Sequence, residues 1–193
     1  QFCGNGNFVE MTVFSFHPVK HIACGEGGMI TTNDKNIYQK LLQLRTHGIT
    51  KDPDLLIENH GGWYYEMHEL GYNYRLTDIQ ATLGTSQLQR ADEGLKRRKE
   101  IAQKYTKSFE NKPFILGQSG LVEGHAYHLY IIEVNNRKKL YEHLRANNVY
   151  AQIHYYPVHL MPYYEQYGWK NGDLPHSERY YEKCISLPKY PTL

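Results

Sequence analysis

The first apolar stretches of the chain are short, and turn residues flank them. Residues 11–16 form a run that stops at Pro18, and residues 29–32 form a second run after the sequence GEGG. Two such runs on either side of a polar, glycine-rich segment predict two β-strands joined by a turn. Lys20 lies in that turn, so we expect its backbone to be fixed at a strand end while its side chain can face a cleft.

Beyond these strands, apolar residues recur at helical spacing. Asn33-Asp34 and Thr77-Asp78 are capping pairs that each precede apolar residues at intervals of three and four, the pattern of an amphipathic helix. The patterns together predict helices at residues 34–46, 78–90, 93–110, from 136 onward and 177–186, with further strands at 126–134 and 149–155.

Strands and helices alternate along the second half of the chain, which predicts an α/β lobe. Helix 93–110 is long and charged, as suits a connector between two lobes, so we divide the chain into residues 1–91 and 92–193. Residues 49–70 show no periodicity. A loop of this length is often functional, and a mobile excursion is an equally good interpretation.

Composition excludes several classes of function. The 193 residues carry 22 basic and 20 acidic side chains, a net charge of +2, which gives no electrostatic basis for binding nucleic acid. Three distant cysteines form no CxxC pair, so we expect neither disulfides nor a cysteine zinc site, and a reducing cytoplasm is the simplest location. No apolar run approaches the ~20 residues that cross a bilayer. Both ends read as cut, so we expect a fragment of a longer protein.

Lys20 is the first candidate for chemistry. A lysine amine that is held at a strand end and kept from water acts as a nucleophile toward carbonyl groups. The spacing alone favours the commoner case, a solvated lysine in a surface loop.

Two longer motifs connect Lys20 to a known family. The segments FSFHPVK and GEGGMITTND around Lys20, and GYNYRLTDIQATLGTSQL around Asn73 and Arg75, resemble the sugar-nucleotide aminotransferases of the DegT/DnrJ/EryC1/StrS family. The resemblance runs in register along essentially the whole chain. It implies the α/β fold of fold-type I pyridoxal 5'-phosphate (PLP) enzymes. Residues 1–91 would be the C-terminal part of the large, PLP-binding domain, and residues 92–193 the small α/β domain.

The resemblance also implies roles for individual residues. Lys20 would bind PLP covalently and act as the catalytic acid and base, and Ser15 would hydrogen-bond the cofactor phosphate. Asn73 would reach the cofactor phosphate of a partner subunit, and Arg75 the nucleotide-sugar pocket there, so a homodimer with shared active sites is expected. An amide and a guanidinium both suit phosphate oxygens. His17 would contact the substrate, lie near the cofactor, or simply pack in the turn.

The segment VYAQIHYYPVH at residues 149–159 resembles the part of the small domain that closes over the sugar nucleotide. His154, Tyr155 and His159 are therefore candidate contacts to its pyrophosphate or sugar. A metal pair formed by His154 and His159 is the rival interpretation. Their spacing fits no tight zinc motif and no acidic residue lies between them, so no metal is expected.

Two further segments, LRTHGITKDP and WYYEM, resemble one branch of the family, which aminates a UDP-linked sugar in pseudaminic acid biosynthesis. This implies transfer of an amino group from glutamate to C4 of a UDP-4-keto-6-deoxy-N-acetylhexosamine. Gly61-Gly62 departs from the proline-containing turn of that branch, which affects the expected loop conformation. The alternatives are a transaminase for another 4-keto or 3-keto sugar nucleotide, or a module that only binds sugar nucleotides or assembles.

Several cofactor-binding groups of the family lie upstream of Gln1 in family order. They are the glycine-rich phosphate loop, the aromatic residue stacked on the pyridine ring and the aspartate paired with the pyridine nitrogen. We therefore expect the isolated chain to be inactive.

Overall fold

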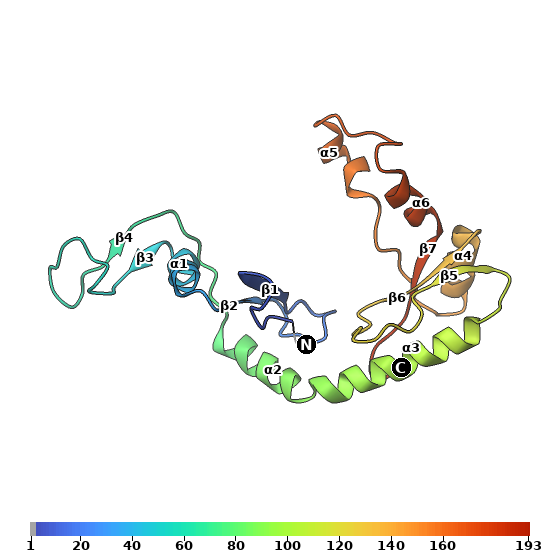
Figure 1. The fold of residues 1–193 in the computed structure, drawn as a ribbon, viewed down its shortest axis with the longest axis horizontal. Helices are drawn as coiled ribbons and strands as arrows, with labels where there is room; N and C mark the ends of the chain where they lie inside the picture. Colours follow the sequence, from blue (N-terminus) through green and yellow to red (C-terminus); the bar gives the residue numbers. More distant parts are fainter. Residues whose placement is uncertain (1–2) are drawn as a thin grey trace. The chain divides into compact units, whose positions relative to one another are not determined.

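The computed structural model describes residues 3–193, which form two compact units (Figure 1). Unit 1 is Gln1–Arg90 and unit 2 is Ala91–Leu193, and each is described by itself below. That these units correspond to the large and small domains of an aminotransferase stays a prediction.

Unit 1 begins with the expected pair of strands. β1 (Met11–Ser15) and β2 (Gly28–Thr32) run antiparallel, with Ser15 opposite Gly28. Both strands are confirmed to within one residue at their ends. They form a two-stranded sheet whose turn carries Lys20.

The two helices of unit 1 start where the capping residues indicated. Asp34 accepts hydrogen bonds from two backbone amides at the start of α1 (Lys35–Arg45). Thr77 and Gln80 form a capping box at the start of α2 (Asp78–Gln89), in which each side chain satisfies a backbone amide of the first turn. Both predicted helices are confirmed.

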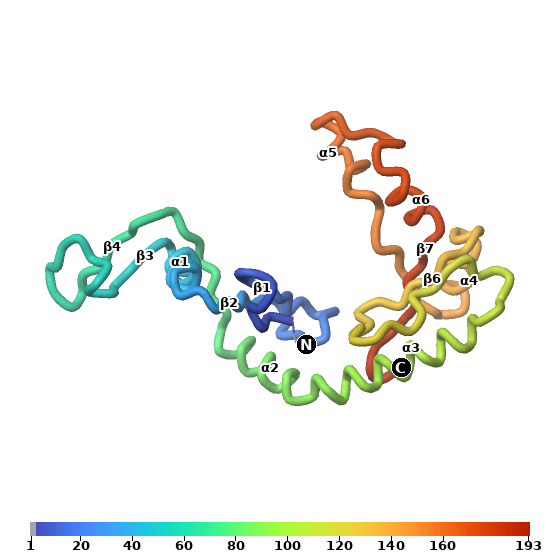
Figure 2. Tube along the Cα trace, in the orientation of Figure 1, coloured from blue at the N-terminus to red at the C-terminus, as the bar shows by residue number. Residues whose placement is uncertain are grey.

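A long hairpin loop lies between these helices. β3 (Ile49–Thr50) and β4 (Glu66–Met67) have two residues each and pair antiparallel. Residues 51–65 connect β3 to β4 as a wide loop, which is visible in the Cα trace (Figure 2). The segment without periodicity is therefore a loop whose base is closed by a strand pair.

Unit 2 is built on a three-stranded antiparallel sheet in the order β5 (Ile115–Gln118), β6 (Tyr130–Val134) and β7 (Cys184–Leu187). Side chains of α3 (Ala91–Phe109) and α4 (Arg137–Ala146) pack against its core. The buried cluster comprises Ala102, Tyr127, Tyr130, Ile132, Val134, Ala151, Ile185 and Leu187.

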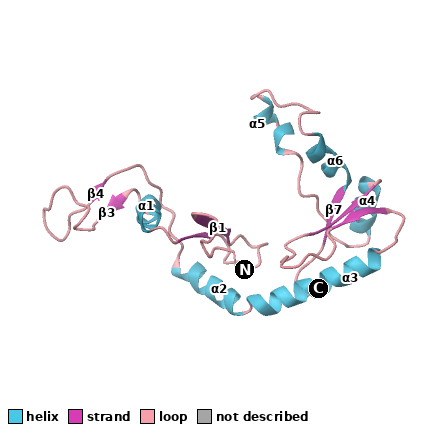
Figure 3. Ribbon diagram, viewed as in Figure 1, coloured by secondary structure: helices cyan, strands magenta, loops and turns pink. Residues whose placement is uncertain are grey.

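Three short helices complete unit 2 (Figure 3): the 3₁₀-helix η1 (Val158–Leu160), α5 (Pro162–Glu165) and α6 (Pro175–Lys183). α5 and α6 each have proline in the first turn, where its missing N–H costs no hydrogen bond. Of the helices in residues 3–193, none combines the length and the apolar character needed to cross a bilayer.

The predicted final helix, residues 177–186, is wrong at its end. α6 stops at Lys183, and Cys184–Leu187 forms β7 instead. All four residues of β7 are buried and pair with β6. Burial in the sheet therefore outweighs the local helical pattern.

Two predicted strands also differ from the structure, and one strand was missed. Residues 149–155 make only a single bridge, between Gln152 and Ser186. The predicted strand 126–134 starts at Tyr130, because Tyr127 has a φ of 50° and breaks the extended backbone. β5 follows α3 in a segment for which the sequence indicated no strand.

Candidate active site

The candidate cofactor lysine lies in a β-turn at the end of β1. The Lys20 amide donates to the His17 carbonyl at 2.9 Å, and Pro18 takes the second position of this turn, which its fixed φ suits. The Cys24 amide then donates to the Phe16 carbonyl at 3.0 Å. The backbone on both sides of Lys20 is thus fixed, and Lys20 itself is half-buried.

Three polar side chains share the turn with Lys20. Ser15 is exposed, and its Oγ accepts a long hydrogen bond from the His17 amide at 3.4 Å. His17 Nε2 lies 4.0 Å from Glu26 Oε1. The structure therefore brings Ser15, His17 and Glu26 to the end of the hairpin that carries Lys20.

The start of α2 packs against the same turn. Gln80 Nε2 donates to the Glu26 carbonyl at 2.9 Å, and Cys24 Sγ donates to the same oxygen at 3.3 Å. Gly27 has a φ of 150°, and a Cβ there would lie 2.7 Å from Leu76 Cδ1. Glycine therefore permits the close approach of Leu76, just before α2, to the lysine turn. Cys24 is buried.

Asn73 and Arg75 lie together in the segment that leads into α2. Arg75 Nε donates to Asn73 Oδ1 at 2.7 Å, and both residues are exposed. Tyr72 and Tyr74 form a stacked pair beside them, with ring centroids 4.9 Å apart. Within residues 3–193, no hydrogen bond or ion pair joins either side chain to Lys20. Their action across a dimer stays a prediction.

The three candidate substrate contacts of unit 2 have different surroundings. His154 Nδ1 hydrogen-bonds Ser186 Oγ at 2.8 Å, and burial lowers the pKa of His154. Tyr155 is exposed and meets the His154 ring edge-on. His159 is only 6% exposed, and its Nε2 bonds Glu178 Oε1 at 2.9 Å. Of these three side chains, Tyr155 is the most open to a ligand.

Glu178, which the sequence did not single out, organises the loop before α6. Its carboxylate bonds the His159 ring and accepts the amides of Gly172, at 2.9 Å and 3.0 Å, and of Leu174, at 3.2 Å. The His159 bond is the main cause of the lowered pKa of Glu178. His154 and His159 thus bond different partners. No group of three metal-ligating side chains occurs in the part of the chain that the structure describes.

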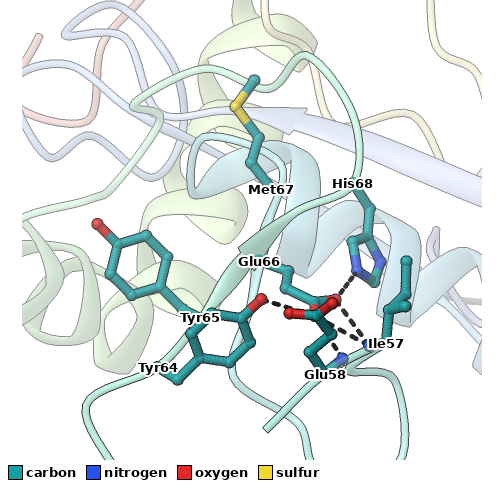
Figure 4. A pocket seen from close by; sticks show the side chains of 7 residues that line it. All are labelled: Ile57, Glu58, Tyr64, Tyr65, Glu66, Met67 and His68. Carbon is teal, nitrogen blue, oxygen red and sulfur yellow. Dashed lines mark hydrogen bonds and ion pairs between the residues drawn. The ribbon is translucent and has the colours of Figure 1, made fainter. Parts of the chain in front are cut away.

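The segment without periodicity forms an open pocket of about 470 Å³ beside β4, lined in part by the WYYEM motif (Figure 4). Its seven lining side chains come from the 51–65 loop and the residues that close it, with the Glu66 carboxylate facing Tyr64, His68 and the backbone of Ile57. The available signal was the pattern Glu-x-His, which occurs twice here, at Glu58 and at Glu66.

The residues around Lys20 fit PLP in kind. A primary amine on a fixed turn suits an aldehyde, and the exposed hydroxyl of Ser15 beside the same turn suits a phosphate oxygen. The amide of Asn73 and the guanidinium of Arg75 add donors of the type that phosphate accepts.

Sequence comparison connects these motifs to known proteins. The model of the DegT/DnrJ/EryC1/StrS aminotransferase family matches residues 4–193. The chain is 42% identical over 196 residues to an uncharacterized protein of Methanocaldococcus jannaschii, and 38% identical over 197 residues to the spore coat polysaccharide biosynthesis protein SpsC of Bacillus subtilis. It is 33% identical over 189 residues to the UDP-4-amino-4,6-dideoxy-N-acetyl-beta-L-altrosamine transaminase of Campylobacter jejuni.

These alignments cover 97%, 97% and 95% of this chain but 51%, 51% and 48% of the three relatives. The chain therefore spans about half the length of the curated relatives that it matches.

Solved structures share the fold. Helicobacter pylori PseC, described as an aminotransferase involved in the biosynthesis of pseudoaminic acid, superposes with a TM-score of 0.85 at 33% identity, over 98% of this chain and 50% of PseC. The PLP form of the putative sugar aminotransferase Spr1654 from Streptococcus pneumoniae gives 0.86 at 29% identity, over 98% and 49%. The predicted α/β fold of PLP-dependent aminotransferases is confirmed.

Proposed function

This chain belongs to the DegT/DnrJ/EryC1/StrS aminotransferase family, a family of sugar aminotransferases, and on that basis we propose its reaction. The protein uses PLP to transfer an amino group from glutamate to C4 of a UDP-4-keto-6-deoxy-N-acetylhexosamine, in the biosynthesis of pseudaminic acid or a related surface glycan. The observation that carries the proposal is Lys20, half-buried on a fixed turn beside the Ser15 hydroxyl.

The names of relatives support the substrate class. The Campylobacter jejuni relative is named for an altrosamine product, and the Helicobacter pylori structure for pseudoaminic acid biosynthesis. The Bacillus subtilis relative is named for a spore coat polysaccharide. The first name contains a UDP-linked amino sugar, and the other two refer to the biosynthesis of pseudoaminic acid and of a polysaccharide. This favours a nucleotide sugar over an amino acid as the acceptor.

Lys20 would perform two tasks with one nitrogen. Its Nζ would hold the cofactor through a covalent bond, and after the donor amine has taken that place it would carry a proton between the two carbon atoms that exchange it. When bound, PLP supplies the electron sink for this exchange. The hydrogen bond between the Lys20 amide and the His17 carbonyl limits backbone motion during both tasks.

The remaining polar residues would bind phosphates and the sugar. Ser15 would donate to the cofactor phosphate of its own subunit, and Asn73 and Arg75 would contact the site of the partner subunit in a homodimer. Both lie exposed at the entrance to α2, where a second subunit can reach them. His17 lies beside the lysine turn and would face the substrate.

In unit 2, Tyr155 would contact the pyrophosphate or sugar directly. His154 is held by Ser186 and would present its ring beside Tyr155. His159 is buried against Glu178. It would therefore affect substrate binding indirectly, by holding the conformation of the loop before α6.

We expect the chain alone, residues 1–193, to be inactive, because unit 1 leaves most of its apolar side chains exposed. The protein expressed from its complete gene, called the gene-length protein below, is the proposed enzyme.

The cysteines of residues 3–193 are free, which supports a cytoplasmic location.

The test is a product assay on the gene-length protein with glutamate and a panel of UDP- and dTDP-linked 4-keto sugars. We expect an amino sugar from the UDP-4-keto-6-deoxy-N-acetylhexosamine, and none with Lys20→Ala. Lys40→Ala, a lysine of α1 that pairs with Glu69, is the matched control and should retain activity. Turnover by Lys20→Ala, or loss of wild-type activity to a chelator, would contradict the proposal.

The same assay separates the enzyme from a module that only binds. A gene-length protein that binds the nucleotide sugar but releases no amino sugar with any donor would be the binding module. A protein that aminates a dTDP-linked or 3-keto sugar instead would keep the reaction class and change the substrate.

A further inference from the structure

Above its strand-paired base, the 51–65 loop is held together by one carboxylate. Glu66, the first residue of β4, accepts the Ile57 amide at 2.8 Å and 3.0 Å and the Glu58 amide at 2.8 Å. It also accepts the Tyr64 hydroxyl at 3.1 Å and bonds His68 Nε2 at 2.6 Å (Figure 4). A single side chain therefore joins the outgoing and the returning arm of the loop.

This carboxylate is well enclosed and strongly stabilised as an anion. Its side chain is 11% exposed. The bond to His68, followed by the bonds from the backbone amides, lowers the pKa of Glu66 to about 2. The carboxylate is therefore ionised at physiological pH, the state in which both of its oxygens accept these donors.

The same loop contains a natural comparison. Glu58 also has a histidine two residues later, and its carboxylate bonds His60 Nε2 at 2.8 Å. The Glu58 side chain is 64% exposed, and among the described residues its carboxylate bonds His60. Glu58 and Glu66 thus share the Glu-x-His spacing, but Glu66 is the one that binds the loop backbone.

The returning arm of this loop carries two exposed aromatic side chains. Trp63 and Tyr65 are exposed, and Lys51 Nζ lies 5.7 Å from the centre of the Tyr65 ring. Gly61 has a φ of 115°, and a Cβ there would lie 2.8 Å from the Trp63 ring, so glycine lets the indole fold over the turn. Tyr65 points away from the Glu66 carboxylate (Figure 4).

Flat, amphipathic rings on a rigid loop are suited to binding a base or a sugar. We propose that Glu66 is a positioning residue, which holds the 51–65 loop in the conformation that presents Trp63 and Tyr65 to the nucleotide sugar. This inference rests on the proposed function. Glu66 takes no part in the chemistry, and the ordering cost of the loop is met before the substrate binds.

The experiment compares Glu66→Gln with Glu58→Gln in the gene-length holoenzyme. Glutamine at position 66 keeps one acceptor oxygen but places an NH₂ group where the second oxygen meets the Ile57 amide and His68 Nε2, and it loses the charge. The first readout is hydrogen exchange of the peptide that contains these two amides, measured without substrate. We expect it to become at least about tenfold faster in Glu66→Gln and to stay unchanged in Glu58→Gln.

The second readout is steady-state kinetics. We expect Glu66→Gln to raise KM for the UDP-4-keto sugar by about tenfold with little change in kcat, because the loop must be ordered on binding. The reaction with glutamate alone, followed through the cofactor spectrum, should stay at the wild-type rate. A misfolded variant would lose both the reaction with glutamate and the reaction with the UDP-4-keto sugar.

The inference is overturned if Glu66→Gln exchanges no faster than Glu58→Gln, or if it exchanges faster while KM stays unchanged. Failure of the proposed function gives a different result. In that case the wild-type protein turns over no nucleotide sugar, whereas the exchange difference between the two variants remains and supports the loop-closing role of Glu66.

Discussion

Unit 1 and unit 2 bury their apolar side chains very differently. Unit 2 has a contiguous core in which Tyr130, Ile132 and Ile185 are almost fully buried. In unit 1 the two-stranded sheet and α2 expose apolar residues such as Val13 and Ile79. A two-stranded sheet is marginal on its own in water. Unit 2 therefore has the means to fold independently, whereas unit 1 needs a covering surface.

The likeness to longer relatives gives this difference a simple interpretation. The chain spans about half of their length, and the proposed homodimer offers a second surface. We infer that the exposed faces of unit 1 are covered in the gene-length protein. In this interpretation the lysine turn lies in the unit that needs this cover, so we expect activity to depend on assembly.

The largest expected effect comes from separating the units. Unit 2 alone, residues 91–193, should unfold in urea in one cooperative transition followed by circular dichroism, because it carries its own core. Unit 1 alone, residues 1–90, should show no cooperative transition and should bind a hydrophobic dye. A cooperative unfolding transition in unit 1, with none in unit 2, would contradict the assignment of the independent core to unit 2.

The next effect comes from shortening one isoleucine in each unit. Ile185→Ala removes a side chain that is 0% exposed and should lower the free energy of unfolding by about 2–5 kcal/mol. Ile79→Ala, at a residue that is 84% exposed, should change it by less than about 0.5 kcal/mol in the isolated chain.

Ile79→Ala in the gene-length protein tests whether the exposed face of α2 is covered there. If the face of α2 that carries Ile79 is covered in that protein, Ile79→Ala should lower the free energy of unfolding by more than roughly 1 kcal/mol, the value for a partly buried side chain. The same small cost in both proteins would show that the α2 face stays open.

A smaller and opposite effect is expected at Lys189 in unit 2. This lysine is buried, and its Nζ donates to the Tyr127 carbonyl. Burial, followed by the nearby Arg98 charge, lowers its pKa from 10.5 to about 7. Lys189→Met should therefore raise the stability of unit 2 at pH 7, by about 1–3 kcal/mol. The exposed Lys138→Met is the matched control.

The pH dependence follows from the same shift. Between pH 7 and 10.5 the unfolded chain holds a proton on Lys189 that the folded chain has released, so stability from this group rises with pH across that window. The advantage of Lys189→Met should shrink toward pH 10.5. Urea midpoints at a series of pH values measure it, and an advantage that grows with pH would contradict the assignment.

The smallest expected effects come from substituting Glu178 and Glu66, the two carboxylates that hydrogen-bond loop amides. Glu178→Gln removes an anion that bonds His159 and two amides in unit 2 and should lower the melting midpoint of unit 2 by a few degrees. Glu66→Gln should leave the global midpoint almost unchanged, because its loop opens locally.

The pKa of Glu178 is lowered, so its contribution is present above the ordinary value of 4.5 and is lost as the pH falls below it. Differential scanning calorimetry of both variants and of the exposed control Glu165→Gln checks these shifts. An equal fall of the melting midpoint in all three variants would contradict the expectation that Glu178 stabilises unit 2 globally and Glu66 only its own loop.

The sequence predicted those parts of the fold that depend on neighbours along the chain. Asp34 and Thr77 cap their helices through residues two or three positions away. The β1–β2 hairpin follows from two short runs around a turn that begins at Pro18. The family motif around Lys20 lies in such a local segment, and this is why the candidate lysine was found.

The sequence did not predict features that depend on distant partners. Residues 184–186 follow the local helical pattern of the sequence, but in the structure they pair with β6. Tyr127 leaves the extended conformation because its hydroxyl bonds the Val122 amide and its carbonyl accepts from Lys189. Glu66 and Glu178 matter through backbone amides that reach them after the loops close.

The central claim is that Lys20 is the lysine that binds PLP. The direct measurement is borohydride reduction of the PLP-loaded gene-length protein, followed by proteolysis and mass spectrometry. We predict that the cofactor mass is found on the peptide that contains Lys20 and is absent from the Lys20→Ala variant. A cofactor adduct on another lysine of the wild-type protein, or an adduct that persists in Lys20→Ala, would contradict the account.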